Sequence, residues 1–320
     1  MKTIQHTLLA TGLLAASSAF AVINIDTVLV GNANNAADST SYGSVSYDYH
    51  IGTYEVTNSQ YTAFLNATAA TDTHSLYSTS MNSDATHGGI TRAGSSGSYT
   101  YSVKSGFSDK PVNFVSFWDA ARFSNWLTTG GTETGVYNLN GTTAPTNNTI
   151  TRDATAWANG GVAVASENEW YKAAYYQPVG AGGDTDSYWQ YSTASNSITT
   201  ADANYNDSVG TVTAVGTYSG DASYYGSFDQ GGNVWEWNDA IESTSARGLR
   251  GGSFVTFVGS LQSSYRVSFD PTSENNRIGF RVSSLEPILA PIPEPSAYAA
   301  IFGSLALAIA IVRRRGRRTL

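Results

Sequence analysis

The stretch FDQGGNVWEW, at residues 228–237, decides the fold of this chain, and two shorter blocks follow it: LRGGSF at 249–254 and IGFRV at 278–282. Glycines flank a segment that carries two tryptophans. Indole rings bury large apolar areas, so we predict that both tryptophans lie in the core. The same segment can present backbone carbonyls and the carboxylate of Glu236 to a cation, because both are oxygen donors.

Three segments carry the signature of a capped helix. The first begins at Thr57, and Tyr61, Phe64 and Leu65 follow at i, i+3 and i+4, on one apolar face. The other two begin at a serine that is followed three residues later by an acidic residue, namely Ser116 with Asp119 and Ser166 with Glu169. We therefore predict helices after residues 57, 116 and 166.

Strands are predicted at 28–30, from an apolar run, and at 51–56, from alternating apolar and polar residues. Residues 68–110 are rich in Ser, Thr and Gly, with little apolar content, and are predicted to form a long surface loop or insertion. Beyond Tyr176 there is little helical periodicity, so short strands and turns are expected up to residue 282. The fold class is therefore predicted to be mixed α+β.

Both ends of the chain are predicted to be targeting segments rather than parts of the fold. A basic start, an apolar run and the small-x-small sequence Ala19-Phe20-Ala21 are typical of a secretory signal peptide, with a buried N-terminal helix as the alternative. The predicted organisation is a signal peptide at 1–21, a strand and linker at 22–46, one domain at 47–284, a linker at 285–296, a transmembrane segment at 297–312 and a basic cytoplasmic tail at 313–320.

The C-terminal order of Pro-Glu-Pro at 293–295, a short apolar stretch and an arginine cluster resembles the PEP-CTERM sorting signal. That resemblance implies recognition by an exosortase, transit through the inner membrane and delivery to the cell envelope or extracellular matrix. A plain tail anchor is the alternative.

Composition excludes several function classes. The chain has no cysteine, so no disulfide contributes to its stability. Its formal net charge of −8 argues against nucleic acid as a partner, because nucleic-acid-binding surfaces are basic. The four histidines are His6, His50, His74 and His87, and their spacing fits neither a zinc site nor a His-carboxylate iron site.

Several blocks, in order along the chain, resemble the formylglycine-generating enzyme (sulfatase-modifying factor) family. They are a strand-to-helix opening at 54–64, a helix at 111–126, a helix at 166–174, the Ala-Asn-Tyr block at 203–205, and the GNVWEW, RGGS and IGFR blocks at 232–237, 250–253 and 278–281. The resemblance implies a single α+β domain related to C-type lectins, with few short helices, short antiparallel strands and much irregular loop.

The resemblance also implies calcium as a cofactor. One site would use the side chains of Asp229 and Glu236 with the carbonyls of Gly232 and Val234. A second would use the side chains of Asn204 and Asp207 with the carbonyls of Tyr205 and Val209. The alternative for Asp229 and Glu236 is that they cap turns. Arg250 and Arg281 recur in the family as structural groups, so they are expected to be structural clamps, with a substrate contact as the alternative. Trp235 and Trp237 are expected to be core residues.

The chain departs from the family at its chemistry. Catalytic members carry two cysteines that bind copper(I), and the positions that match them here are Thr256 and Leu261. Neither side chain is a ligand for copper(I), which needs soft thiolates, so no copper is expected.

The sequence therefore favours an exported, calcium-stabilised and non-catalytic binding or structural module, with an extracellular polysaccharide or an envelope protein as partner. Tyr188, Trp189 and Tyr191 are candidates for stacking on sugar rings, with packing under their loop as the alternative. A rival hypothesis is an oxidoreductase of the same superfamily with a metal centre built from His50, His74, His87 and a carboxylate. Whether the chain is an enzyme is left open at this point.

Overall fold

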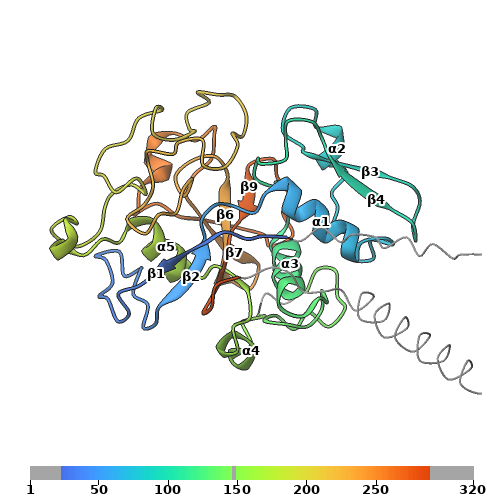
Figure 1. The fold of residues 1–320 in the computed structure, drawn as a ribbon, viewed down its shortest axis with the longest axis horizontal. Helices are drawn as coiled ribbons and strands as arrows, with labels where there is room; N and C mark the ends of the chain where they lie inside the picture. The colour runs from blue at the N-terminus through green and yellow to red at the C-terminus, as the bar shows by residue number, and fades with distance from the viewer. Residues whose placement is uncertain (1–22, 146–148, 289–320) are drawn as a thin grey trace, which may run out of the picture.

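Two four-stranded sheets form the centre of the part that the computed structural model describes, residues 23–145 and 149–288 (Figure 1). The first sheet is antiparallel and contains, in order, β1 (Thr27–Val30), β2 (Tyr49–Gly52), β10 (Val282–Ser284) and β5 (Ala163–Val164). The second contains, in order, β8 (Val267–Phe269), β7 (Ala246–Arg250), β6 (Trp235–Ser243) and β9 (Ile278–Phe280). In it β6 and β9 are parallel, and the other pairs are antiparallel. Since only Arg281 separates β9 from β10, one short segment joins the two sheets.

The strand predicted at 28–30 is confirmed as β1, which pairs with β2. Within the segment predicted as a strand and linker, at 22–46, the side chains of Ile23, Ile25 and Val45 are buried. The strand predicted at 51–56 begins earlier and ends at Gly52. Beyond it, the N–H of Val56 donates to the carbonyl of Phe280 while the chain turns toward the first helix.

The three predicted helices are confirmed: α1 (Asn58–Thr68), α3 (Phe117–Thr129) and α5 (Glu167–Tyr175). Each begins with a capping box, in which the hydroxyl of the capping residue accepts from the N–H three residues later and that residue's side chain accepts from the N–H of the cap. The described part also contains the short helices α2 (Ser80–Ser83) and α4 (Ala154–Ala158), and the 3-10 turns η1 (Val179–Ala181) and η2 (Val258–Leu261).

The main core lies where α1 and α3 meet the second sheet. The ring of Phe123 packs edge-to-face against Phe64 and Phe280, with centroids 5.4 Å apart in both pairs. All three rings are fully buried, and each contributes about 1.5–3 kcal/mol of burial free energy. A second core forms where α5 covers the first sheet, and it contains Tyr49 and Trp170. The two cores set the positions of both sheets and of the loops between them.

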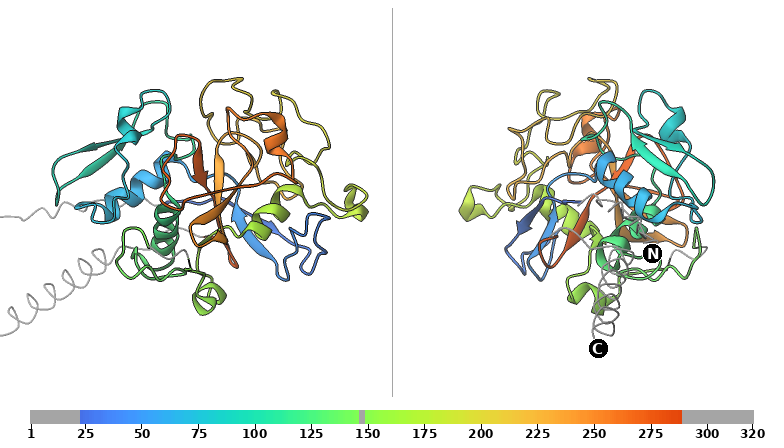
Figure 2. Two further views of the ribbon diagram at one scale, coloured as in Figure 1. Left: turned by 180° about the vertical axis from the view of Figure 1, so that it is seen from behind. Right: turned by 45° about the vertical axis from the view of Figure 1, so that its right-hand side comes forward.

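Residues 68–110, predicted as a long surface loop or insertion, do not form a plain loop, because the segment contains α2 and a hairpin of β3 (Ile90–Ala93) and β4 (Thr100–Val103). The hairpin lies beside α1 (Figure 2). Only Ile90 in β3 and Tyr101 in β4 are buried. One buried residue in four leaves a sequence pattern too sparse to be recognised as a strand.

The predicted signal peptide at 1–21, the predicted transmembrane segment at 297–312 and the basic tail at 313–320 lie outside the described residues. Among residues 23–145 and 149–288, no helix has both the length and the apolar character needed to cross a bilayer.

Replacing the cap of α1 is expected to destabilise the protein. In Thr57→Ala the N–H of Gln60 loses its acceptor, so the free energy of unfolding should fall by about 1 kcal/mol. Urea denaturation followed by circular dichroism measures this. The matched variant Thr57→Ser keeps a hydroxyl and should stay near the wild type, whereas equal losses in the two variants would contradict a capping role.

Candidate functional site

Arg281, in the IGFR block between β9 and β10, contacts the GNVWEW block and the residues just before the block at 54–64. Its side chain is fully buried, and its Nε and Nη2 donate to Oε2 and Oε1 of Glu236 at 2.6 and 2.7 Å. It also donates to the carbonyls of Gly52, Thr53 and Phe228. Burial lowers the pKa of Arg281, but the carboxylate of Glu236 outweighs this effect and raises that pKa above its usual value. Arg281 is therefore enclosed as a structural clamp.

Both oxygens of Glu236, on β6, accept hydrogen bonds in this arrangement. Its Oε2 accepts a further hydrogen bond from Nε1 of Trp170, at 2.8 Å, so its two oxygens accept three hydrogen bonds in all. The side chain is fully buried. A carboxylate that accepts two N–H bonds from one edge of a guanidinium forms a bidentate pair, and such charge-assisted hydrogen bonds are among the strong ones in proteins.

Two further acids lie near this ion pair. Burial raises the pKa of Glu55 well above its usual value, and the carboxylates of Asp229 and Glu236 raise it further. Burial also raises the pKa of Asp229 to about 6, although the N–H of Gly216 stabilises its charged form. Oε1 of Glu55 accepts from Nδ2 of Asn233, while its Oε2 has no hydrogen-bond partner among the described residues. Burial and the neighbouring carboxylates therefore favour the protonated form of Glu55, and the charge of Glu236 is neutralised by Arg281.

These residues do not fit the calcium site that the resemblance implied for Asp229, Gly232, Val234 and Glu236. Calcium needs several free oxygen ligands, with affinity set by the charge they carry. Both oxygens of Glu236 accept hydrogen bonds from Arg281. Asp229 is then the one implied calcium ligand whose negative charge is not paired with an arginine. Within the described ranges, no group of three or more His, Cys, Asp or Glu side chains is arranged to hold a metal ion.

The second set implied for calcium lies on one turn, at 204–209. Asn204 is buried and its Oδ1 lacks a partner in the described part of the chain, but Asp207 and Val209 are exposed. The carbonyl of Tyr205 accepts from the N–H of Ser208. Asp207 is the single charged member, so the set has few charges with which to bind a divalent cation. Calcium at this turn stays a prediction.

The two positions matched to the copper-binding cysteines have separate structural roles. The hydroxyl of Thr256 accepts from the N–H of Ser253 at 2.9 Å and donates to its carbonyl at 3.0 Å, closing a tight turn. Leu261, on η2, is fully buried in a small apolar cluster with Tyr191 and Tyr205. A turn-closing hydroxyl and a buried leucine replace the thiol pair.

The aromatic residues proposed for sugar stacking are placed mostly inside the molecule. Tyr188 and Tyr191 are 5% and 6% exposed, and the hydroxyl of Tyr188 donates to the carbonyl of Ala36. Trp189 is half-buried, and its Nε1 donates to Oε1 of Gln177. Tyr188 and Tyr191 are therefore packed under their loop, and their buried rings are not available for stacking on a sugar.

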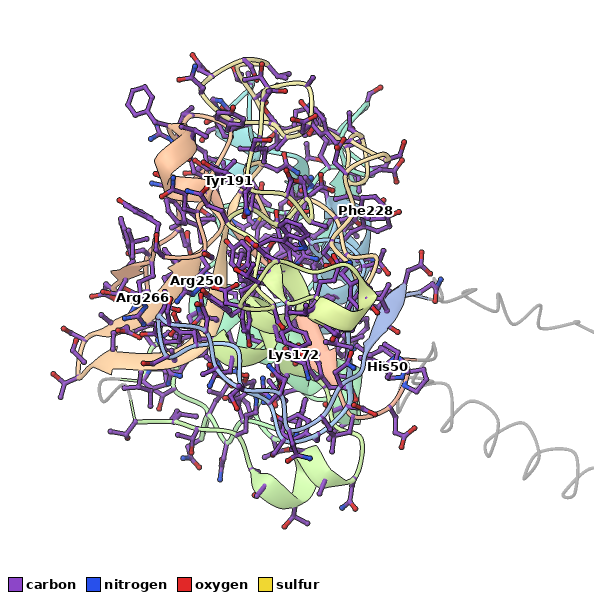
Figure 3. The ribbon with its side chains drawn as sticks, turned by 90° about the vertical axis from the view of Figure 1, so that its left-hand side faces the viewer. His50, Lys172, Tyr191, Phe228, Arg250 and Arg266 are labelled. Atoms are coloured by element: carbon purple, nitrogen blue, oxygen red, sulfur yellow. The ribbon has the colours of Figure 1, made fainter. Side chains whose placement is uncertain are left out.

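Arg250, at the end of β7, forms a second buried clamp. It shares Glu167 with Arg266, with shortest N–O distances of 2.7 and 2.8 Å, and Figure 3 shows the two arginines close together on that side of the molecule. The guanidinium of Arg250 also lies over the ring of Tyr42 at 4.6 Å. This pairing fastens the N-terminal loop to α5. Trp237 is fully buried and Trp235 half-buried, packed against the main core.

The histidines of the rival hypothesis have separate partners. Nδ1 of His87 lies 3.0 Å from Oδ2 of Asp84, and Nε2 of His74 lies 3.3 Å from Oε1 of Glu133. His50 contacts Oγ1 of Thr27 through Nδ1, at 3.5 Å. They do not form one donor set among the described residues.

Sequence reasoning missed one feature of this face, the exposed ring of Phe257. It is 76% exposed and lies between Thr256 and the buried Leu261. The RGGS block ends at Ser253, and the residues between it and Phe257 do not show whether that phenylalanine is exposed or buried in the core.

Removing the central arginine is expected to be severe. Arg281→Met leaves Glu236 buried without its counter-charge, so the free energy of unfolding should fall by about 3–5 kcal/mol in urea denaturation. The exposed Arg277 is the control, and Arg277→Met should change stability by less than about 0.5 kcal/mol. An Arg281→Met variant as stable as the wild type would refute the clamp.

Calcium dependence can be assigned by comparing Asp229→Asn with Asp207→Asn. We measure Tm in excess chelator and after calcium is restored. If wild-type Tm rises with calcium, Asp229→Asn should show the same rise and Asp207→Asn should lose it, because the carboxylate of Glu236 is bound to Arg281. Loss of the response in Asp229→Asn would show instead that the Glu236 set binds the ion.

The family model described as sulfatase-modifying factor enzyme 1-like domain matches residues 19–284. The chain is similar to the crystal structure of CarF, at 23% identity and a TM-score of 0.56, over 82% of this chain and 99% of that one. It is also similar to Treponema denticola variable protein 1, at 18% identity and a TM-score of 0.53, over 83% and 99%. At such identities the likeness shows the fold alone.

No curated protein matches the chain at a significant level. The predicted fold class is confirmed by the small sheets and few short helices together with the family match. Because the matched region spans most of the sequence, the chain belongs to the family of sulfatase-modifying factor enzyme 1-like domains, the family of the formylglycine-generating enzyme.

Proposed function

We propose that the chain is a non-catalytic binding module built on the formylglycine-generating enzyme scaffold. The observation that carries this proposal is the burial of Leu261, together with the turn closed by Thr256. In the family's oxidases two thiols at these positions bind copper(I). Here one position is packed into an apolar cluster and the other is bonded within the backbone turn at Ser253. Neither position can supply a thiolate.

A second observation supports binding rather than chemistry. Two acids near the GNVWEW block have structural partners or surroundings: Glu236 is paired with Arg281, and burial raises the pKa of Glu55. Groups with shifted pKa values often mark active sites, but buried ion-pair networks shift pKa values as well. The hydrogen bonds of Glu236 support the interpretation of this cluster as a buried ion-pair network.

The proposal includes export. The signal at 1–21 would direct the chain across the inner membrane, and the PEP-CTERM-like end would be recognised by an exosortase, placing the domain in the cell envelope or extracellular matrix. A polysaccharide or an envelope protein would then be its partner. The net charge of −8 makes nucleic acid an unsuitable partner.

The proposal is tested by assaying formylglycine formation. The full chain, supplied with copper(I) and oxygen, should leave a sulfatase-derived cysteine peptide unmodified in mass spectrometry, whereas a cysteine-bearing member of the family should convert it. Conversion by this chain above the no-enzyme background would overturn the non-catalytic assignment. A pull-down with isolated cell-envelope fractions from the source cells then tests the binding role.

A further inference from the structure

The loop after β7 presents an aromatic side chain to solvent on a rigid support. Phe257 is 76% exposed and the adjacent Val258 is 39% exposed, whereas Leu261, one turn later, is completely buried. Single exposed apolar residues are common, but Phe257 is the most exposed of the large apolar side chains in the described part of the chain and Val258 lies next to it, so this loop is a candidate contact surface.

The loop is held in place on both sides of the ring. Before it, the hydroxyl of Thr256 is bonded to both backbone groups of Ser253. After it, the N–H of Ser260 donates to the carbonyl of Phe257 at 2.9 Å, and the side chain of Leu261 anchors η2 in its apolar cluster. Because this support is fixed, little conformational entropy is lost when a ligand stacks on the ring.

A second loop lies against the first and adds polar groups. The N–H of Asn206 donates to the carbonyl of Thr256 at 2.8 Å, and that of Asp207 donates to the carbonyl of Phe254 at 2.7 Å. Figure 1 shows η2, in orange, among these yellow loops. Asn206 and Asp207 are both exposed, and both have left-handed backbones, with φ of 55° and 56°.

From this juxtaposition we propose that Phe257, with Asn206 and Asp207 beside it, forms a binding site for a neutral polysaccharide. One sugar ring would stack on the face of Phe257, and its hydroxyls would donate to the carboxylate of Asp207 and bond with the amide of Asn206. This site is distinct from Tyr188, Trp189 and Tyr191, and it rests on the proposed function as a binding module.

The chemistry and size of the surface favour a sugar over a protein partner. The exposed apolar groups here are Phe257, Val258 and the neighbouring Val209, which is 49% exposed. A standard protein interface takes about 20–30 residues from each side, whereas one aromatic ring matches one sugar ring. Hydroxyls need the amide and carboxylate acceptors that this surface offers. The charge of Asp207 and the net charge of −8 disfavour acidic polymers.

The test is affinity electrophoresis of the full chain, purified in detergent, in gels containing dextran, mannan, soluble cellulose oligosaccharides or the acidic polymer alginate. We expect at least one neutral polymer to retard the wild type, and alginate not to. In Phe257→Ala the affinity should fall by about tenfold or more, as for other anchoring aromatic residues. Phe257→Tyr should retain binding, because its ring is kept.

The matched control is Phe269→Ala, which removes a 46% exposed phenylalanine from β8 and should bind like the wild type. Equal Tm values for the variants show that folding is intact. Undiminished binding by Phe257→Ala, or equal losses in Phe257→Ala and Phe269→Ala, would overturn the site but leave the binding module standing. Binding of alginate alone, or of none of the polymers, would overturn the assignment of a neutral polysaccharide as the ligand. The formylglycine assay decides the proposed function separately.

Discussion

The ion pair between Arg281 and Glu236 is the contact on which the arrangement of both sheets depends. Moving two charges out of water costs several kcal/mol each, and the cost is offset only when every donor and acceptor is used. Arg281 meets this condition by bonding the end of β2, the segment before the GNVWEW block and β6 together. A shift of any one of these elements would leave a buried charge unpaired, so the elements assemble as a unit.

Other buried pairs of arginine and carboxylate explain how a chain without disulfides stabilises so much irregular structure. Arg250 and Arg152 act in similar buried networks, Arg250 with Glu167 and Arg152 with Glu169 and Asp239. Burial raises the pKa of Glu169, but the hydrogen bonds and charge of Arg152 outweigh it and hold that pKa at about 2, so this carboxylate stays charged across the physiological range. Arginine suits this role because its five donors can satisfy several loop carbonyls together with one acid.

How far the sequence predicts the structure depends on how local the responsible interaction is. The three capped helices were predictable because a hydroxyl and its partner three residues away are visible in the sequence. The partner of Glu236 was not, because it lies 45 residues away and either a cation or an arginine could neutralise the same carboxylate. The β3–β4 hairpin escaped prediction because it buries too few apolar residues. Phe257 and Leu261 are both apolar, and only packing separates the exposed one from the buried one.

The position of β10 has a consequence for how the chain becomes folded. This strand lies between β2 and β5, yet it is the last of the described strands to be synthesised. Until residue 284 is available, β2 and β5 lack the neighbour that joins them, and Arg281 is not yet present to neutralise Glu236. Pairing between such distant segments forms slowly. The first sheet therefore stays incomplete, and the carboxylate of Glu236 stays without its counter-charge, until residues 281–284 have been synthesised.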